Sequence, residues 1–198
     1  GLQRTVISGN GKNGVETWAA DLQLANALIG LAKDGRTQMG NGASGVWVAM
    51  GADGITIGTT EGAKTVISGN GEKGIQIDAD RSTVVCTYVG VNMDTTTAVP
   101  NGKSGLWITS SAISAKIGDI SGTDAAAKVV KCAGDCAMNN LDDDAANSNC
   151  LSECQPCHNV ISGNAKWGLY IDGPNAEISQ AYIGVDKSGS VAVPNGED

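Results

Sequence analysis

Two aspartates stand at matching places in a repeated pattern, and their spacing bears on hydrolytic chemistry. Asp78 follows Ile-Gln-Ile, and Asp172 follows Leu-Tyr-Ile. Inverting glycosidases use two carboxyl groups roughly 6.5–9.5 Å apart, one as acid and one as base. If both aspartates end strands that are two stacked turns apart, about 9–10 Å separates them. Aspartates beside strands are common in solvated turns, and we favour that interpretation for both.

Other residues suited to proton transfer are few. His158 is the only histidine, and the arginines are confined to positions 4, 36 and 81. No short apolar strand carries two carboxylates on one face, which is the minimum arrangement for glycoside hydrolysis. The sequence therefore argues against a self-contained enzyme, and we assign no catalytic residue.

Six cysteines are present, and five lie in one polar segment: Cys132, Cys136, Cys150, Cys154 and Cys157. We interpret them as disulfides formed in an oxidising compartment. Two alternatives stay open. One is a set of free thiols in a cytosolic protein, and the other is a structural zinc site that includes His158. The CxxxC and CxxC spacings fit no common zinc pattern well.

Calcium is the remaining ion to weigh, because several turns carry oxygen ligands. Asp34, Asp94 and Asp186 lie in turns, and three aspartates follow one another at 142–144. None of these segments has the dense ligand spacing of a calcium loop. We favour solvated acidic loops and expect no cofactor.

An internal repeat positions all of these residues. Thr-Val-Ile-Ser-Gly-Asn begins at Thr5 and again at Thr65, and Asn-Val-Ile-Ser-Gly-Asn begins at Asn159. The offsets are 60 and 94 residues, so the third copy follows an insertion of 34. Strands of the type Gly-apolar-x-apolar begin at positions 15, 46, 75, 106 and 169. Each unit therefore contains two turns of about 30 residues.

Apolar segments of three residues, separated by Gly and Asn, are too short for amphipathic helices. Stacked on their equivalents, they form continuous parallel sheets, and parallel crossovers are right-handed. We expect an all-β, right-handed, single-stranded parallel β-helix. Residues 1–120 and 159–198 are turns of one solenoid, and 121–158 is a cysteine-rich insert. Two inward ladders should fill the core: Val15, Val46, Ile75, Leu106 and Leu169, and Ile7, Ile29, Ile67, Val89, Ile161 and Ile183.

The middle residue of each Gly-apolar-x-apolar strand should point outward, because side chains alternate along a strand. These residues are Glu16, Trp47, Gln76, Trp107 and Tyr170. Exposed aromatic side chains every second turn would suit stacking on an extended polysaccharide, with Gln76 and Glu16 bonding its hydroxyls. A protein partner suits the same face. A third alternative is that loops such as 34–45 and 94–104 cover the indoles, and the sequence does not separate the three.

The other ladder also has apolar residues at its outer positions: Val6, Leu28, Val66, Tyr88, Val160 and Tyr182. Such a stripe fits either a lateral interface between solenoids or a bent strand that places both residues partly inside. We favour the bent strand.

Cys86 directly precedes the strand that begins at Thr87, and Cys157 stands just ahead of the matching strand at Asn159. Stacked turns bring equivalent Cα atoms to about 4.8 Å, within the range of a disulfide. We predict a Cys86–Cys157 bond that ties the insert to the solenoid. The other four cysteines would form two bonds inside the insert, with connectivity open.

Composition limits the partners. The net charge of −8 and the pI of about 4.5 argue against nucleic acid or an anionic membrane. No apolar run approaches the roughly 18–20 residues of a membrane span. With 28 glycines, no phenylalanine and 17% charged residues, the chain suits short strands and tight turns.

Three strings carry a resemblance to a known family: Val-Ile-Ser-Gly-Asn, Tyr-Ile-Gly-Val-Asp-Lys-Ser-Gly and Ala-Val-Pro-Asn-Gly. They resemble the pectin-lyase-like parallel β-helix superfamily, and more narrowly its repeat-rich secreted or surface-anchored members. The resemblance covers nearly the whole chain outside about 120–158. It implies the fold and an extracellular location. The family's lyase, polygalacturonase and epimerase motifs are not found in this sequence.

We therefore expect an extracellular structural β-solenoid that contacts other copies, surface proteins or glycans. The alternative is a carbohydrate-active enzyme or its substrate-binding portion. The ends lack an amphipathic cap, from which we expect either a longer chain or end-to-end pairing into filaments.

Overall fold

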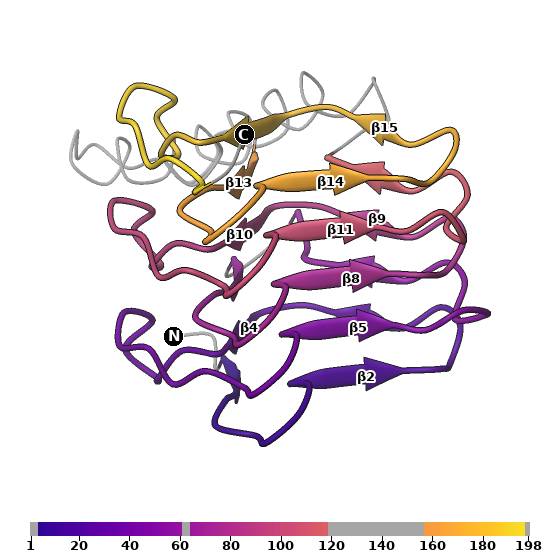
Figure 1. Cartoon of the computed structure of the whole chain (residues 1–198), viewed down its shortest axis with the longest axis horizontal. Helices are drawn as coiled ribbons and strands as arrows, with labels where there is room; N and C mark the ends of the chain where they lie inside the picture. Colours follow the sequence, from indigo (N-terminus) through magenta and orange to yellow (C-terminus); the bar gives the residue numbers. More distant parts are fainter. Residues whose placement is uncertain (1–3, 61–63, 119–156, 197–198) are drawn as a thin grey trace, which may run out of the picture.

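A computed structural model describes residues 4–60, 64–118 and 157–196. Within these ranges every regular element is a β-strand, and the strands form three parallel sheets (Figure 1). The expectation of an all-β fold with stacked parallel strands is confirmed.

Each sheet takes one strand from every turn. Sheet A contains β1 (Thr5–Ile7), β4 (Ala27–Ile29), β7 (Thr65–Ile67), β10 (Thr87–Val89), β13 (Asn159–Ile161) and β16 (Ala181–Ile183). Sheet B contains β2 (Val15–Thr17), β5 (Val46–Val48), β8 (Ile75–Ile77), β11 (Leu106–Ile108) and β14 (Leu169–Ile171). Sheet C contains β3 (Gln23–Leu24), β6 (Thr56–Ile57), β9 (Thr83–Val84), β12 (Lys116–Ile117) and β15 (Glu177–Ile178).

The chain visits sheets A, B and C in that order and then begins the next layer. Figure 1 shows the result in sheet B, where β2, β5, β8, β11 and β14 stack in sequence order. This arrangement is that of a parallel β-helix. The segment 119–156 lies between β12 of sheet C and β13 of sheet A, and 61–63 lies between β6 of sheet C and β7 of sheet A.

Branched aliphatic side chains fill the space between the sheets. The inward ladder of sheet B pairs Val15 with Val46, Val46 with Ile75, and Ile75 with Leu106. In sheet A, Ile29 pairs with Ile67 and Ile67 with Val89. The inner residues of the middle turns are fully buried in one cluster. Both inward ladders expected from the sequence are thus present.

Sheet C was not foreseen, because strands of two residues leave no alternation to detect. Its inward positions are held by Leu24, Ile57, Val84, Ile117 and Ile178. Ile57, Val84 and Ile117 are buried and belong to the same core cluster as the other two sheets.

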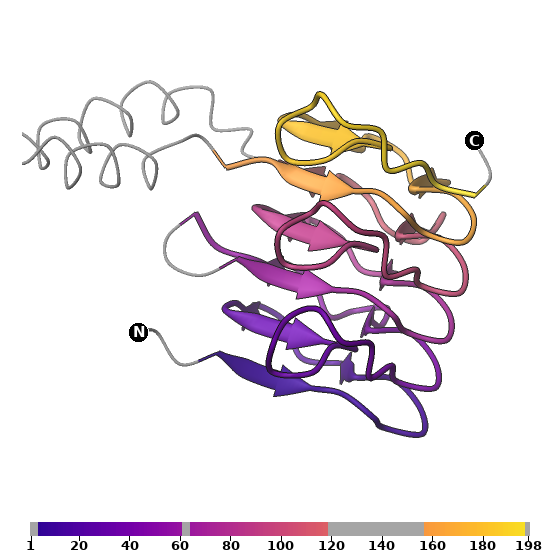
Figure 2. The ribbon, with the colours of Figure 1, turned by 90° about the vertical axis from the view of Figure 1, so that its left-hand side faces the viewer.

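The outer side of sheet A has its own apolar cluster. Leu28, Val66 and Val160 pack there against residues of the loops that follow β4, β10 and β16, including Leu31, Val91, Val99 and Val193. Figure 2 faces this side and shows the loops lying in front of the sheet. The preference for a bent strand was wrong: these side chains point outward and the loops bury them.

Hydroxyl groups anchor these loops. Ser8, Ser68 and Ser162 each donate a hydrogen bond from Oγ to a carbonyl at the start of a loop, at 2.7, 2.7 and 2.8 Å. Each loop is closed by an antiparallel bridge, such as Leu31 to Gln38 and Val91 to Ala98. The loops therefore belong to the fold as a second layer over sheet A.

A ladder of six asparagines runs along the corner between sheets A and B: Asn10, Asn41, Asn70, Asn101, Asn164 and Asn195. The Nδ2 of each of the first five donates to the Oδ1 of the next asparagine at 2.8 to 3.0 Å. The later members also donate to carbonyls of sheet A. Buried amide groups are costly unless bonded, so a complete ladder fixes the register of successive turns.

Candidate ligand-binding face

The outer side of sheet B carries one row of side chains across five turns. Backbone pairing aligns Glu16 with Trp47, Trp47 with Gln76, Gln76 with Trp107, and Trp107 with Tyr170. Glu16 and Tyr170 are exposed, and Trp47, Gln76 and Trp107 are half-buried. The register places all five residues of the expected row together on one surface.

Two further tryptophans join this row, and sequence reasoning missed both. The ring centroid of Trp18 lies 5.6 Å from that of Trp47, edge to face. Trp167 stacks on Tyr170 at 4.9 Å, and Tyr170 contacts Trp107 at 6.1 Å. Trp18 stands two residues after Glu16, so alternation could have placed it on the same side. We call these seven residues, with all four tryptophans of the chain among them, the aromatic face.

The loops do not cover this face. They pack on sheet A instead, and Trp18 remains 65% exposed and Tyr170 38% exposed. Trp47 and Trp107 are half-buried and contact side chains of their own sheet surface.

Each of the two central indoles is held by an aspartate of the next turn. Trp47 Nε1 donates to Asp78 at 2.6 Å, and Trp107 Nε1 donates to Asp172 at 3.3 Å. These are the two aspartates at matching repeat positions. Sequence reasoning treated them as turn carboxylates and did not foresee that they are partners of the tryptophans.

Polar groups fill the space between Trp47 and Trp107. Gln76 Nε2 donates to both Asp78 oxygens at 3.1 Å, and Gln76 Oε1 accepts from Lys73 Nζ at 3.1 Å. Lys73 Nζ also lies 4.8 Å from the ring centroid of Trp107. A continuous set of contacts thus joins the two indoles and holds them in place.

Glu16 is engaged in the same way at the first turn. Its carboxylate accepts from Trp18 Nε1 at 3.3 Å and from Asn13 Nδ2 at 2.9 Å. Glu16 and Gln76, which we expect to bond a ligand's hydroxyls, thus both bond to protein groups as well. Their carboxylate and amide oxygens keep further lone pairs that can accept from a ligand.

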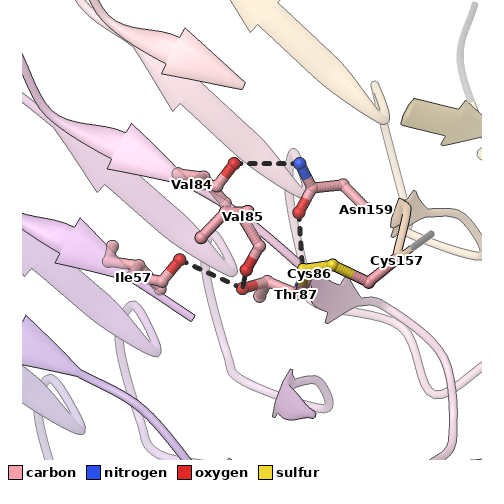
Figure 3. The surroundings of a disulfide bond; sticks show 7 residues. All are labelled: Ile57, Val84, Val85, Cys86, Thr87, Cys157 and Asn159. Carbon is pink, nitrogen blue, oxygen red and sulfur yellow. Dashed lines mark hydrogen bonds between the residues drawn. A yellow bond between two sulfur atoms is a disulfide. The ribbon is translucent and has the colours of Figure 1, made fainter. Parts of the chain in front are cut away.

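The predicted Cys86–Cys157 disulfide is present, with Cα atoms 5.2 Å apart (Figure 3). Cys86 is fully buried and has a φ of 52°, in the left-handed region. Beside it, Asn159 Nδ2 donates to the Val84 carbonyl and Asn159 Oδ1 accepts from Thr87 N, both at 2.9 Å. The bond therefore fixes the point at which the chain re-enters sheet A after the insert.

The other four cysteines, Cys132, Cys136, Cys150 and Cys154, lie outside the described residues, as do the aspartates at 142–144. Cys157 is in a disulfide, so it is not a thiolate for zinc. His158 stacks on Tyr182, with ring centroids 4.5 Å apart.

Asp34 and Asp186, in the loops over sheet A, bond within their own turns, whereas Asp94 pairs with Arg36 of the loop after β4. Asp34 accepts from the hydroxyl and amide of Thr37 and from the amide of Arg36, and these bonds lower its pKa to about 2. The Ser188 hydroxyl lowers the pKa of Asp186, with help from nearby amides. Over residues 4–60, 64–118 and 157–196, no three His, Cys, Asp or Glu side chains are grouped closely enough to hold a metal ion.

In the same ranges, no helix has the length and hydropathy needed to cross a membrane. No protein-family model, no curated protein and no solved structure matches this chain.

Proposed function

We propose that this protein is an extracellular β-solenoid scaffold whose aromatic face binds an extended glycan. We further propose that it is a right-handed member of the pectin-lyase-like superfamily, with turns of about 30 residues. The observation that carries the proposal is the gathering of all four tryptophans and Tyr170 on one outer sheet surface.

Ring spacing supports a glycan ligand. Trp47 and Trp107 are two turns apart in sheet B, with Gln76 between them. At about 4.8 Å per turn, the two rings are offset by about 10 Å along the solenoid axis. This offset is close to the length of a disaccharide, so one polysaccharide chain can stack a ring on each tryptophan.

The rigidity of the face supports the same function. The Asp78 and Asp172 contacts hold the indoles before a ligand arrives. Binding then orders few side chains, which lowers its entropic cost. Carboxylate and amide oxygens beside the rings supply acceptors for sugar hydroxyls.

The pattern of side chains favours a glycan over a protein partner. The centre of a protein–protein interface is depleted of charged residues. Asp78 and Lys73, in contrast, stand between the two central tryptophans. Aromatic rings interleaved with charged and amide groups suit a ligand that has both apolar ring faces and many hydroxyls.

An extracellular location is supported by the Cys86–Cys157 disulfide and by the concentration of cysteines in the insert. Disulfides persist mainly in oxidising compartments. In such a setting a rigid rod with one glycan-binding side would hold a matrix or cell-surface assembly together.

Affinity electrophoresis of the whole, disulfide-bonded chain through gels containing soluble polysaccharides tests the proposal. Trp47→Ala and Trp107→Ala should each weaken binding roughly five- to thirtyfold, because each removes about 1–2 kcal/mol of stacking. Met39→Ala is the matched control. Met39 is also a large, exposed side chain (49%), but it lies in a loop over sheet A, where its backbone N donates to the Gly30 carbonyl. Equal losses in all three variants would contradict the proposal.

A further inference from the structure

The side chain of Lys73 places an ammonium group at the centre of the aromatic face, between Gln76 and Trp107. Its Nζ lies over the Trp107 ring and bonds to Gln76 Oε1. Only 14% of its side chain is exposed. A carboxylate on a sugar ring stacked between Trp47 and Trp107 would meet this group first.

Glu72 holds that ammonium group. Its Oε2 lies 3.3 Å from Lys73 Nζ, and its Oε1 lies 2.8 Å from Lys103 Nζ. The bond from Lys103 is the main reason that the pKa of Glu72 lies below its usual value, and the bond from Lys73 adds to it. One carboxylate therefore occupies both lysines.

Glu72 interrupts a column of lysines at the edge of sheet B. Backbone hydrogen bonds stack Lys12, Ala43, Glu72, Lys103 and Lys166 in successive turns. The four remaining positions of this column hold three lysines and one alanine. The one carboxylate in it comes at the turn that also carries Lys73.

On the opposite edge of sheet B, Asp78 directly follows β8 and Asp172 directly follows β14. An anionic chain lying along the axis would approach these carboxylates and find Lys73 already paired. The net charge of −8 adds a general repulsion of polyanions. The charges of the face therefore complement an uncharged ligand.

We propose that the aromatic face binds an uncharged, extended polysaccharide along the solenoid axis, and that Glu72 excludes polyuronates by occupying Lys73 and Lys103. This inference rests on the glycan-binding function proposed above and names the class of glycan. It also assigns Glu72 as a residue that determines specificity by positioning and neutralising the lysines.

Affinity electrophoresis with three neutral polysaccharides (hydroxyethyl cellulose, arabinoxylan and galactomannan) and two acidic ones (polygalacturonate and alginate) tests it. The unaltered chain should bind at least one neutral polymer and neither acidic polymer. Glu72→Gln keeps the shape of the side chain but removes its charge. This variant should gain binding to polygalacturonate by about three- to tenfold, and added salt should abolish the gain.

The double variant Glu72→Gln/Lys73→Met is the control and should lose that gain. Thermal unfolding followed by circular dichroism checks that each variant folds. If the unaltered chain prefers an acidic polymer, this inference is wrong and the glycan-binding function stands. If it binds none of the five polymers, both are wrong. If Glu72→Gln gains no acidic binding while neutral binding persists, the role of Glu72 is wrong.

Discussion

The indole of Trp47 donates to the carboxylate of Asp78 at 2.6 Å, across one turn of the solenoid. Trp107 and Asp172 repeat this relationship at 3.3 Å. In both pairs a tryptophan in the outward row of sheet B bonds to an aspartate just after the next strand. A repeated contact of this kind ties two indoles, two turns apart, to aspartates at equivalent positions.

Replacing Asp78, the hydrogen-bond acceptor of the Trp47 indole, should leave the indole in place but less well ordered. Asp78→Ala should weaken glycan binding about three- to tenfold, because Trp47 loses a hydrogen bond to a charged group of about 1.5–2 kcal/mol and must be ordered on binding. Thr109 occupies the equivalent place after β11, and its Oγ1 donates to the Ile77 carbonyl at 3.2 Å rather than to an indole. Thr109→Ala is therefore the matched control and should bind nearly as well as the unaltered chain, as measured by isothermal titration. A similar loss in both variants would rule out orientation of Trp47 by Asp78.

The asparagine ladder predicts a graded effect on stability. Asn70 is buried, accepts from Asn41, and donates to Asn101 at 3.0 Å. Asn70→Ala should cost about 2–4 kcal/mol in the free energy of unfolding, because it breaks several buried hydrogen bonds and leaves partners unpaired. Asn10 is exposed and stands first in the ladder, so Asn10→Ala should cost about 1 kcal/mol or less. Chemical denaturation compares the two, and equal costs would contradict a cooperative ladder.

The disulfide should stabilise the fold by constraining the unfolded chain. Cys86 and Cys157 are 71 residues apart in sequence. A loop of that length predicts about 4 kcal/mol of stabilisation by the chain-entropy estimate, within a range of about 2–5. Cys86→Ser/Cys157→Ser should lower the free energy of unfolding by that amount, and peptide mapping of the unreduced protein should recover the linked pair. Mapping that pairs Cys86 with any other cysteine would overturn the assignment.

Acid should weaken the loop that covers sheet A. The pKa of Asp34 is lowered to about 2 by bonds from Thr37 and Arg36, against a usual value of 3.8. A carboxyl group with a lowered folded pKa stabilises the fold above its unfolded pKa and loses that contribution as the pH falls. The difference in melting temperature between the unaltered chain and Asp34→Asn should therefore be constant above about pH 4 and shrink between pH 4 and 2. A difference that is unchanged at pH 2 would show that the charge of Asp34 contributes nothing.

Much of the fold follows from the sequence, and the reasons are local. The repeated Val-Ile-Ser-Gly-Asn string and the spaced Gly-apolar-x-apolar strands predict the ladders through Ile67 and Ile75. The sequence also predicts the Cys86–Cys157 bond, because stacking brings equivalent positions together. Sheet C was not predicted, because its strands have only two residues and so show no alternation of apolar and polar side chains.

The site was harder to predict for a different reason. The outward row from Glu16 to Tyr170 follows from alternation alone, but partners across turns do not. The bond from Trp47 to Asp78 depends on how turns stack and on which rotamers the neighbours allow. The burial of Leu28 depends on where the following loop folds back over sheet A, and no local sequence pattern specifies that position.

The most direct test of the central claim uses the four indole N–H groups as reporters, because every tryptophan of the chain lies on the aromatic face. Nitrogen-15 NMR of the folded chain resolves these four signals, and single Trp→Phe variants assign them. Titration with neutral polysaccharide fragments should shift the Trp47 and Trp107 signals together at one saturating concentration. Binding that shifts only backbone signals of sheets A and C, or no shift with any glycan tested, would contradict the account.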